Sequence, residues 1–354
     1  MDSKTAYDAT KFRILMLHGE IITDILFLKD SLILLTRVSL TGFGSNRTEF
    51  RAKSSRISKR IHELVTPAII AEFPGGIEFL YPNAPITLEP PLGFGTDITE
   101  QKGKWSVHDA IHGEDSDSTA MAWWYGRDNV SRYRGIENSL SFVARYIHGR
   151  PIHGIIGFSQ GACLSGMICS LLECINDPQK AAAIRLQNLP VDDYLRLPCQ
   201  EPLRFFIGIG GYRGTLQYYG SLYSSLIKTP SCHALASMDF VVEPFQTMNL
   251  AGCFSSPELV HFYGCHFVPR DRASVEALAH FALRNSRETS PSSRFPSVVR
   301  AWSESDGDES RSSTWGPDQS LRILPVWREL RKPKVIRGRV IRLPISRRPI
   351  SAST

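Results

Sequence analysis

The stretch HGIIGFSQGA, residues 153–162, decides the fold of this chain. HGII at 153–156 has the composition of a short buried strand, and the small residues after Ser159 open a helical pattern that continues to Glu173. Glycines two residues on either side of Ser159 remove Cβ atoms where a strand turns sharply into a helix. This order of strand, turn and helix predicts that the Ser159 hydroxyl is presented as a nucleophile. A glycine-rich packing turn without chemistry is the alternative.

Other apolar runs of strand length recur along the chain, and helical patterns fall between several of them. The runs lie at 12–17, 77–81, 152–156, 203–209, 232–237 and 259–263, and helical spacing is found at 54–64, 136–147, 161–173 and 274–283. Strands that alternate with helices are typical of a doubly wound sheet. The sequence therefore predicts one α/β domain over residues 1–284, with a mostly parallel sheet flanked by helices.

Charge separates the body of the chain from its end. The net charge is +6, and residues 285–354 alone hold 14 Lys and Arg against 7 Asp and Glu. The near-neutral remainder argues against nucleic acid as a partner, because a nucleic-acid-binding domain carries a basic stripe on its folded surface. The end is rich in Ser, Arg and Pro, and we expect it to be a disordered basic tail, either merely solvated or able to touch lipid, RNA or an acidic carrier domain.

The cysteines and the N-terminus favour a reducing compartment. The seven cysteines are an odd number, and no CxxC pair or zinc-type spacing occurs among them. Residues 1–13 contain no apolar core of a secretion signal, so we expect a cytoplasmic protein. Charged residues interrupt the apolar segment 20–41, so that a membrane span is not expected. Nothing in the motifs calls for a metal or a cofactor.

A serine nucleophile needs a base, and in this type of fold the order along the chain is Ser, an acid, then His. His266 follows the apolar run 259–263 on a loop, where catalytic groups gather. His233 and His261 fall inside predicted strands, and His280 falls on a predicted helix. We therefore predict His266 as the base, with a loop histidine bonded to backbone as the alternative.

The orienting carboxylate is expected at the end of the strand before that histidine. Asp239 closes the apolar run 232–237 and is our choice, whereas Glu243 in the following turn is the competitor. Either residue could instead be a solvated turn acid.

Two backbone N–H groups should hold the negative charge that develops on the substrate oxygen. We expect one from Gln160, directly after the nucleophile, and the other from Glu20, in the loop after the first strand. Trp123 and Trp124 are predicted either to line an acyl pocket or, with equal weight, to be core aromatics.

With these residues in place, the chain resembles the FSH-type family of serine hydrolases, a mainly fungal group that includes the ovarian-cancer-associated-gene-2-like proteins. The resemblance spans roughly residues 12–284. It rests on ILMLHG at 14–19, WW at 123–124, GIIGFSQGA at 154–162, DFVV at 239–242 and GCHFVP at 264–269. It implies an α/β-hydrolase fold, a triad of Ser159, Asp239 and His266, no cofactor or metal, and an acyl ester or thioester as substrate. Some fungal relatives act with polyketide synthases, which makes such a synthase an expected partner.

One segment departs from the family pattern. Relatives run from the Leu-His-Gly of the first strand directly into a loop that resembles the sequence from Gly42 onward, whereas this chain inserts Glu20–Thr41. We hypothesise that the insertion is a translated, unspliced intron, and that Phe43 supplies the second oxyanion donor once it is removed. Transcript reads that cover the insertion uniformly would contradict this hypothesis.

These observations predict a serine hydrolase that cleaves an acyl ester or thioester through an acyl-enzyme, and the family resemblance implies a role in secondary-metabolite biosynthesis. Three alternatives stay open: a peptidase or amidase with the same triad, a non-catalytic scaffold whose oxyanion loop is damaged by the insertion, and an adaptor that acts through its basic tail.

Overall fold

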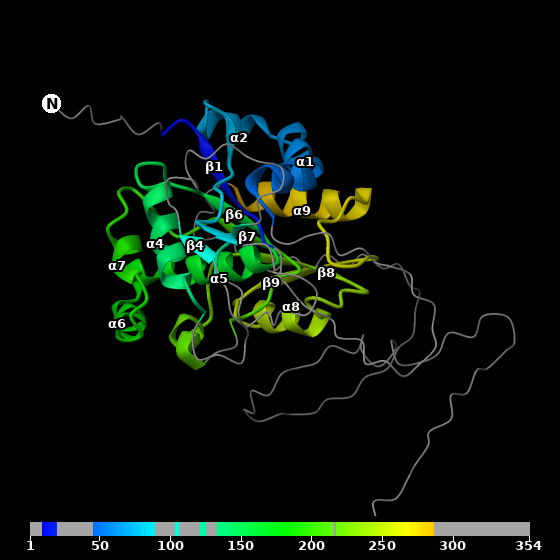
Figure 1. Cartoon of the computed structure of the whole chain (residues 1–354). Helices are drawn as coiled ribbons and strands as arrows, with labels where there is room; N and C mark the ends of the chain where they lie inside the picture. The colour runs from blue at the N-terminus through cyan, green and yellow to red at the C-terminus, as the bar shows by residue number, and fades with distance from the viewer. Residues whose placement is uncertain are drawn as a thin grey trace, which may run out of the picture. The chain divides into compact units, whose positions relative to one another are not determined.

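The computed structural model describes residues 9–19, 45–88, 103–105, 121–124, 133–214 and 217–286, with backbone alone for residues 88, 103–105 and 217. The predicted insertion Glu20–Thr41 lies outside the described residues, as does the predicted basic tail after Ser286. The described elements form an α/β-hydrolase fold built on a parallel sheet (Figure 1).

Six parallel strands form the main sheet in the order β2-β1-β6-β7-β8-β9. They are β1 (Phe12–Leu17), β2 (Ile77–Leu80), β6 (Gly154–Phe158), β7 (Phe205–Ile209), β8 (Ser231–Ala236) and β9 (Pro257–Phe262). In the centre, β1 pairs with β6 so that Ile14 lies opposite Gly154, and β6 pairs with β7 so that Gly154 lies opposite Phe205. Since every pairing in this sheet is parallel, all the strands end at the same edge.

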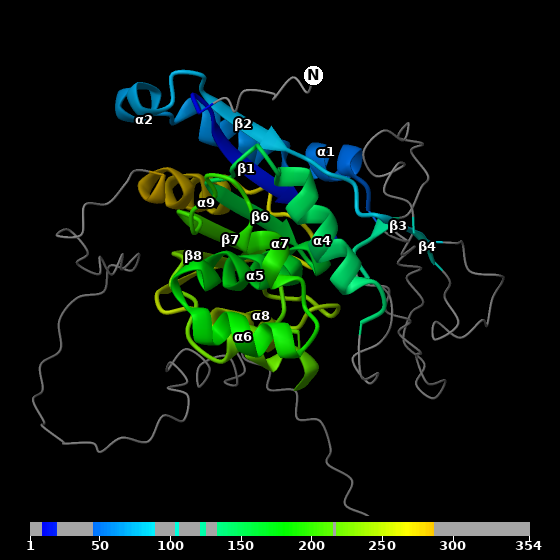
Figure 2. The same cartoon turned by 90° about the vertical axis from the view of Figure 1, so that its left-hand side faces the viewer.

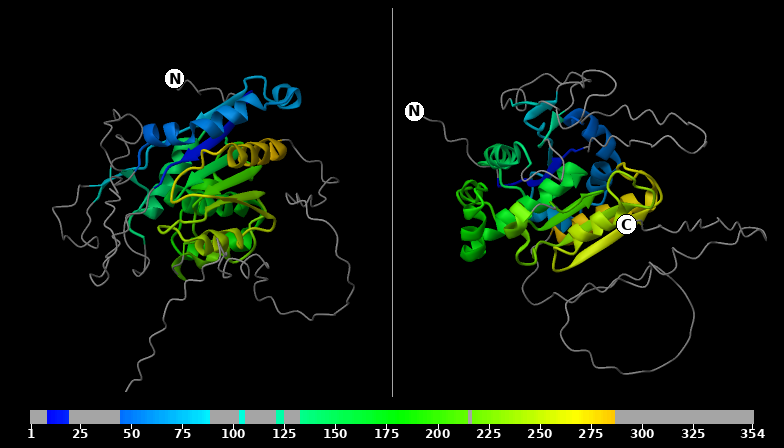
Figure 3. Two further views of the ribbon diagram at one scale, coloured as in Figure 1. Left: turned by 90° about the vertical axis from the view of Figure 1, so that its right-hand side faces the viewer. Right: turned by 60° about the horizontal axis from the view of Figure 1, so that its bottom comes forward.

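Helices cover both faces of the sheet (Figures 2 and 3). One face carries α1 (Arg47–Glu63), α2 (Pro67–Glu72) and α9 (Arg272–Asn285). The other face carries α4 (Ile136–Ile147), α5 (Gln160–Glu173), α6 (Pro178–Leu186), α7 (Val191–Leu195) and α8 (Pro244–Ala251), together with the 3₁₀ turns η2 (Cys174–Asn176) and η3 (Gln217–Tyr223). The doubly wound architecture predicted from the alternation of strands and helices is confirmed.

The apolar core explains why the central strands read as unbroken hydrophobic runs. Every residue of β1, β6, β7 and β8 is buried, as expected for strands that pack against helices on both faces. On the face of α1 and α9, Phe50, Ile57 and Leu278 belong to one buried apolar cluster. On the other face, α5 is buried along almost its whole length, so its first turn, which follows β6, is held in place by the core.

A small antiparallel sheet, which the sequence pattern did not predict, lies outside the main one. It has the order β4-β3-β5, with β3 (Ile86–Leu88), β4 (Gly103–Trp105) and β5 (Met121–Ala122). Its strand β5 leads directly into Trp123 and Trp124. In the described part of the chain, no helix is both long enough and apolar enough to cross a membrane.

Candidate active site

Ser159 lies on a strained turn between β6 and α5. Its φ of 53° and ψ of −121° are rarely adopted by a residue with a side chain, and its N–H donates to the carbonyl of Ile209 at 2.9 Å. The flanking glycines are required by contact: a Cβ on Gly157 would lie 2.5 Å from the carbonyl oxygen of Gly161, and one on Gly161 would lie 2.2 Å from that of Leu17. The turn thus holds the serine at the carboxyl-terminal edge of the sheet.

The three residues predicted as a triad are hydrogen-bonded in series. His266 Nε2 lies 2.8 Å from Ser159 Oγ, and His266 Nδ1 lies 2.7 Å from Asp239 Oδ2. The other oxygen of Asp239 accepts from the backbone N–H groups of Val241 at 3.0 Å and Val242 at 2.8 Å. A carboxylate engaged in this way accepts a hydrogen bond from Nδ1–H, so Nε2 is left without a proton and can accept the one from serine.

The fold brings these side chains together because each one follows a parallel strand. Ser159 follows β6, while Asp239 and His266 come after β8 and β9. Asp239 and Ser159 are buried, and the His266 side chain is nearly so. The Phe158 ring packs against the imidazole with the ring centroids 4.8 Å apart, which helps to fix its orientation.

Gly210 makes room for the histidine and was not singled out from the sequence. It follows β7 with a φ of 52°, and a Cβ there would lie 3.1 Å from His266 Cε1 and 3.4 Å from Asp239 Oδ2. A glycine directly after the predicted strand 203–209 could have indicated a close contact there, but the sequence alone does not say which side chain the glycine faces.

The residues that competed for these roles are engaged elsewhere. Buried His233 contacts Ser231, exposed His261 lies on β9, and His280 lies on α9 beside Glu276. Glu243 is the N-cap of α8, where it forms a reciprocal capping box with Gln246.

Of the predicted oxyanion donors, only Gln160 can be located. It is the first residue of α5, and its backbone N–H lies against Gly19, where an added Cβ would be 2.7 Å from the nitrogen. Glu20 and Phe43 lie outside the described residues. The second donor therefore stays a prediction.

The Gln160 side chain joins two family motifs that are far apart in the sequence. Its Oε1 accepts from the N–H of Trp123 at 2.8 Å, and its Nε2 donates to the carbonyl of Trp124 at 2.9 Å. Trp123 in turn donates through Nε1 to the carbonyl of His18 at 2.5 Å. The strand-end motif, the tryptophan pair and the elbow thus meet directly behind the nucleophile.

His18 is buried in its neutral form beside this junction. Its Nε2 accepts from the N–H of Ala84 at 2.9 Å, and burial lowers its pKa to about 3, with a smaller contribution from Lys53. An uncharged imidazole here adds no positive charge to the core.

The two tryptophans are buried among other aromatic rings. Trp123 exposes none of its surface and contacts Phe142, while Trp124 stacks on Tyr133 with the centroids 5.1 Å apart. These contacts belong to the core described above, and a role in lining an acyl pocket remains a prediction.

Among the described residues, no group of three or more His, Cys, Asp or Glu side chains is placed to hold a metal ion.

Comparison with known proteins identifies the family. The sequence profile of the family described as Serine hydrolase (FSH1) matches residues 33–278. The chain belongs to this family. It is therefore a serine hydrolase, and the resemblance drawn from its motifs is confirmed. The profile match begins inside the predicted insertion and leaves out β1 and its Leu-His-Gly.

Curated relatives of this FSH1-type serine hydrolase are distant. Family of serine hydrolases 2 of Saccharomyces cerevisiae is 26% identical over 210 residues, covering 58% of this chain and 83% of that protein. An esterase of Anopheles gambiae is 22% identical over 252 residues, covering 69% and 75%. Among solved structures, Zea mays acyl-protein thioesterase 2 matches with a TM-score of 0.42 at 15% identity, covering 81% of this chain and 97% of that one. This last likeness carries no information on substrate.

Proposed function

We propose that this serine hydrolase cleaves an acyl ester or thioester through Ser159, His266 and Asp239. The observation that carries the proposal is the unbroken series of hydrogen bonds from the Asp239 carboxylate through the imidazole to the serine hydroxyl, 2.7 and 2.8 Å long. Membership of a serine hydrolase family supports the same reaction class.

The reaction proceeds in two acyl-transfer steps. His266 Nε2 takes the proton of Ser159 as Oγ attacks the substrate carbonyl carbon, and the same proton then passes to the departing alcohol or thiol. Water, deprotonated by the same imidazole, attacks the acyl-enzyme and releases the carboxylic acid, returning the proton to Ser159. Asp239 stabilises the imidazolium in both steps.

Negative charge on the carbonyl oxygen is held by backbone N–H groups in this proposal. Gln160 contributes one from the start of α5, where the helix N-terminus adds positive potential. The second comes from the loop after β1: Glu20 in the chain as printed, or Phe43 if the insertion is absent from the mature protein.

The Ser159→Ala variant tests the nucleophile. Hydrolysis of a p-nitrophenyl acyl ester should fall by about 10⁴-fold or more, because no other group can form the acyl-enzyme. Covalent labelling by a fluorophosphonate probe should vanish, while the far-UV circular dichroism spectrum stays that of the parent. Ser55→Ala, at an exposed site on α1, serves as the matched control. Labelling that survives in Ser159→Ala would refute the assignment.

The same assays distinguish the alternatives. A non-catalytic scaffold predicts that the parent protein is not labelled at all, and a peptidase or amidase predicts that amides are cleaved faster than matched esters and thioesters. We expect the ester or thioester to be the better substrate. A role in releasing a chain from a polyketide synthase is proposed from the family resemblance alone, and turnover of a carrier-bound thioester tests it directly. A cytoplasmic location is proposed from the sequence alone.

A further inference from the structure

A cavity of about 300 Å³ lies between the start of α1, the end of β2 and helix α4. This volume is at the lower end of the range for small-molecule pockets, ~300–1,000 Å³. The side chains that give it chemical character are Arg47, Thr48, Arg51, Phe79, Tyr81 and Tyr146. The proposed reaction uses none of them.

Two arginines line the α1 side of the cavity. Arg47 and Arg51 are four residues apart on the helix, so both face the same way. The Arg51 guanidinium lies over the Tyr81 ring, 5.4 Å from its centroid, and Arg51 forms no ion pair within the described part of the chain. A stacked guanidinium keeps its edge N–H groups available for a ligand.

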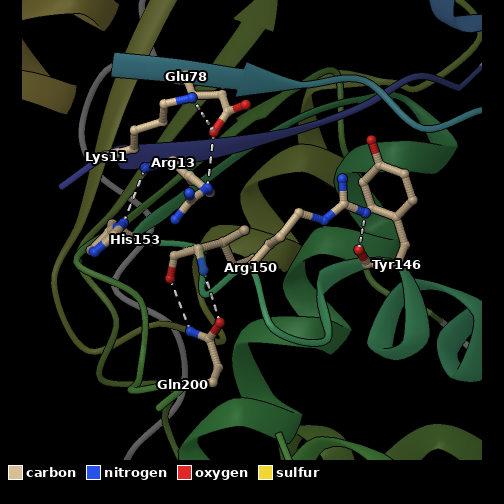
Figure 4. Close-up of polar contacts among 8 residues, drawn as sticks. Lys11, Arg13, Glu78, Tyr146, Arg150, His153 and Gln200 are labelled. Carbon is tan, nitrogen blue, oxygen red and sulfur yellow. Dashed lines mark hydrogen bonds and ion pairs between the residues drawn. The ribbon is translucent and has the colours of Figure 1, made fainter. Parts of the chain in front are cut away.

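A third arginine, Arg150, contacts the lining residue Tyr146 but does not itself line the cavity. Figure 4 shows the Arg150 side chain lying against Tyr146. The guanidinium carbon is 4.4 Å from the centroid of the Tyr146 ring, and an Arg150 N–H donates to the Tyr146 carbonyl oxygen. Burial raises the pKa of Tyr146, although the charges of Arg150 and Arg47 act in the opposite direction. The phenol therefore keeps its proton at neutral pH and can donate it in a hydrogen bond.

Two acidic side chains beside the described lining residues are already bound to other cations. Glu78, the neighbour of Phe79 on β2, is held by Arg13 at 2.9 Å and by Lys11 at 3.8 Å, as Figure 4 shows. Glu49 on α1 pairs with Lys53 at 3.3 Å. The described lining residues thus bring two arginine charges to the cavity and no carboxylate.

We propose that this cavity is a binding site for a phosphate group carried by a small molecule. Guanidinium groups match phosphate oxygens with two parallel N–H donors, and a phosphate has enough acceptor oxygens to use the tyrosine and threonine hydroxyls as well. The rings of Phe79 and Tyr81 then face the part of the ligand next to the phosphate.

The position of the cavity leaves two sources for that phosphate. Tyr81 follows β2 and Ser159 follows β6, with β1 between these strands, so the two strand ends are separated by roughly 10 Å at one edge of the sheet. A phosphate on the thiol leaving group of a thioester could reach the cavity while the acyl group lies at Ser159. A separate phosphorylated metabolite is the other source.

Titration of the protein with inorganic phosphate, by calorimetry at constant ionic strength, tests the site itself. Arg51→Gln should weaken phosphate binding about tenfold or more, the loss expected for one charge-assisted contact. Arg47→Gln should do the same and provides a second variant if the first is unstable. Lys59→Gln removes a charge from an exposed position of the same helix and should bind as the parent does. The Ser159→Ala protein should also bind normally, so a failure of the proposed reaction would leave this test unaffected.

Kinetics then identify the source. The ratio of kcat/KM for hexanoyl-coenzyme A to that for p-nitrophenyl hexanoate should fall about tenfold in Arg51→Gln if the phosphate belongs to the leaving group. An unchanged ratio, with phosphate binding lost, assigns the site to a separate phosphorylated molecule. Parent protein that does not bind phosphate, or Arg51→Gln and Arg47→Gln variants that bind it as tightly as the parent, would overturn the proposal.

Discussion

Asp239 uses both of its oxygens, and this determines what the residue can do. Oδ1 is held by two backbone N–H groups, so the carboxylate cannot rotate away, and Oδ2 is left to face the imidazole at 2.7 Å. The backbone thus positions Asp239, and Asp239 positions His266. The tautomer with a proton on Nδ1 follows from this arrangement, because a carboxylate can only accept.

Replacing Asp239 by Asn should therefore disable the base while preserving the turn. The amide oxygen can still accept from Val241 and Val242, but the amide nitrogen then faces Nδ1 and favours the tautomer with a proton on Nε2. We expect kcat for a p-nitrophenyl ester to fall by about 10⁴-fold at neutral pH, with little change in the melting temperature.

Glu243→Gln is the matched control for that variant. Because Glu243 caps α8 and does not contact the histidine, its substitution should leave kcat within about twofold of the parent value. If Glu243→Gln lost activity and Asp239→Asn kept it, the carboxylate would have been misassigned.

At this scale, sequence reasoning located Ser159, Asp239 and His266 correctly as neighbours because strand ends in a parallel sheet share one edge. It did not find the contacts of Gln160 with Trp123 and Trp124, which precede Gln160 by 37 and 36 positions in the sequence. Spacing carries no information about such a contact, since it depends on how the two tryptophans after β5 pack against the elbow.

The elements were predicted unevenly for a physical reason. All six strands of the main sheet overlap apolar runs. In β1, β6, β7 and β8, burial on both faces makes the strand continuously hydrophobic. The edge strands β2 and β9 are less buried. The strands β3, β4 and β5 have two or three residues each, too few for any period to be visible. Helix α1 was predicted from residue 54 but begins at Arg47, where Asn46 provides the N-cap and accepts from the N–H of Glu49 at 3.0 Å.

Contact between the end of β1 and the start of α5 predicts the effect of one substitution. In Gly161→Ala, the new Cβ would lie 2.2 Å from the carbonyl oxygen of Leu17, a backbone atom of a central strand that cannot easily move. We expect a loss of about 3 kcal/mol in the free energy of unfolding, measured in urea, and a loss of esterase activity.

Gly166→Ala on the same helix is the comparison. Its Cβ would meet the end of the flexible Leu250 side chain at 3.1 Å, and replacing glycine by alanine favours a helix interior by about 1 kcal/mol. This variant should be as stable as the parent or slightly more stable. Equal losses in the two variants would mean that the close approach of β1 to the elbow is not what requires glycine at position 161.

At the scale of the whole molecule, buried neutral histidines link stability to pH. Burial lowers the pKa of His18 and of His233 to about 3, and burial with the nearby Arg204 and Arg13 lowers that of His153 to about 4. All three stay neutral in the folded protein at pH 5 to 6, whereas the unfolded chain takes up a proton at each below about pH 6.5. Acid therefore favours the unfolded state.

The free energy of unfolding should accordingly fall as the pH drops from 6.5 towards 4, by up to about 1.4 kcal/mol per pH unit for each of these histidines. His233→Phe isolates one of them, because the His233 ring makes edge contacts with the stacked rings of Phe206 and Phe254, and a third aromatic ring suits that site. In urea titrations at pH 7.5, 6.5, 5.5 and 4.5, this variant should lose stability with acid less steeply than the parent. A packing defect would lower stability equally at every pH, so only the slope of stability against pH reports on protonation.

His280→Gln, at an exposed position on α9, is the control and should keep the slope of the parent. Parallel profiles for His233→Phe and the parent would show that His233 does not resist protonation in the folded state.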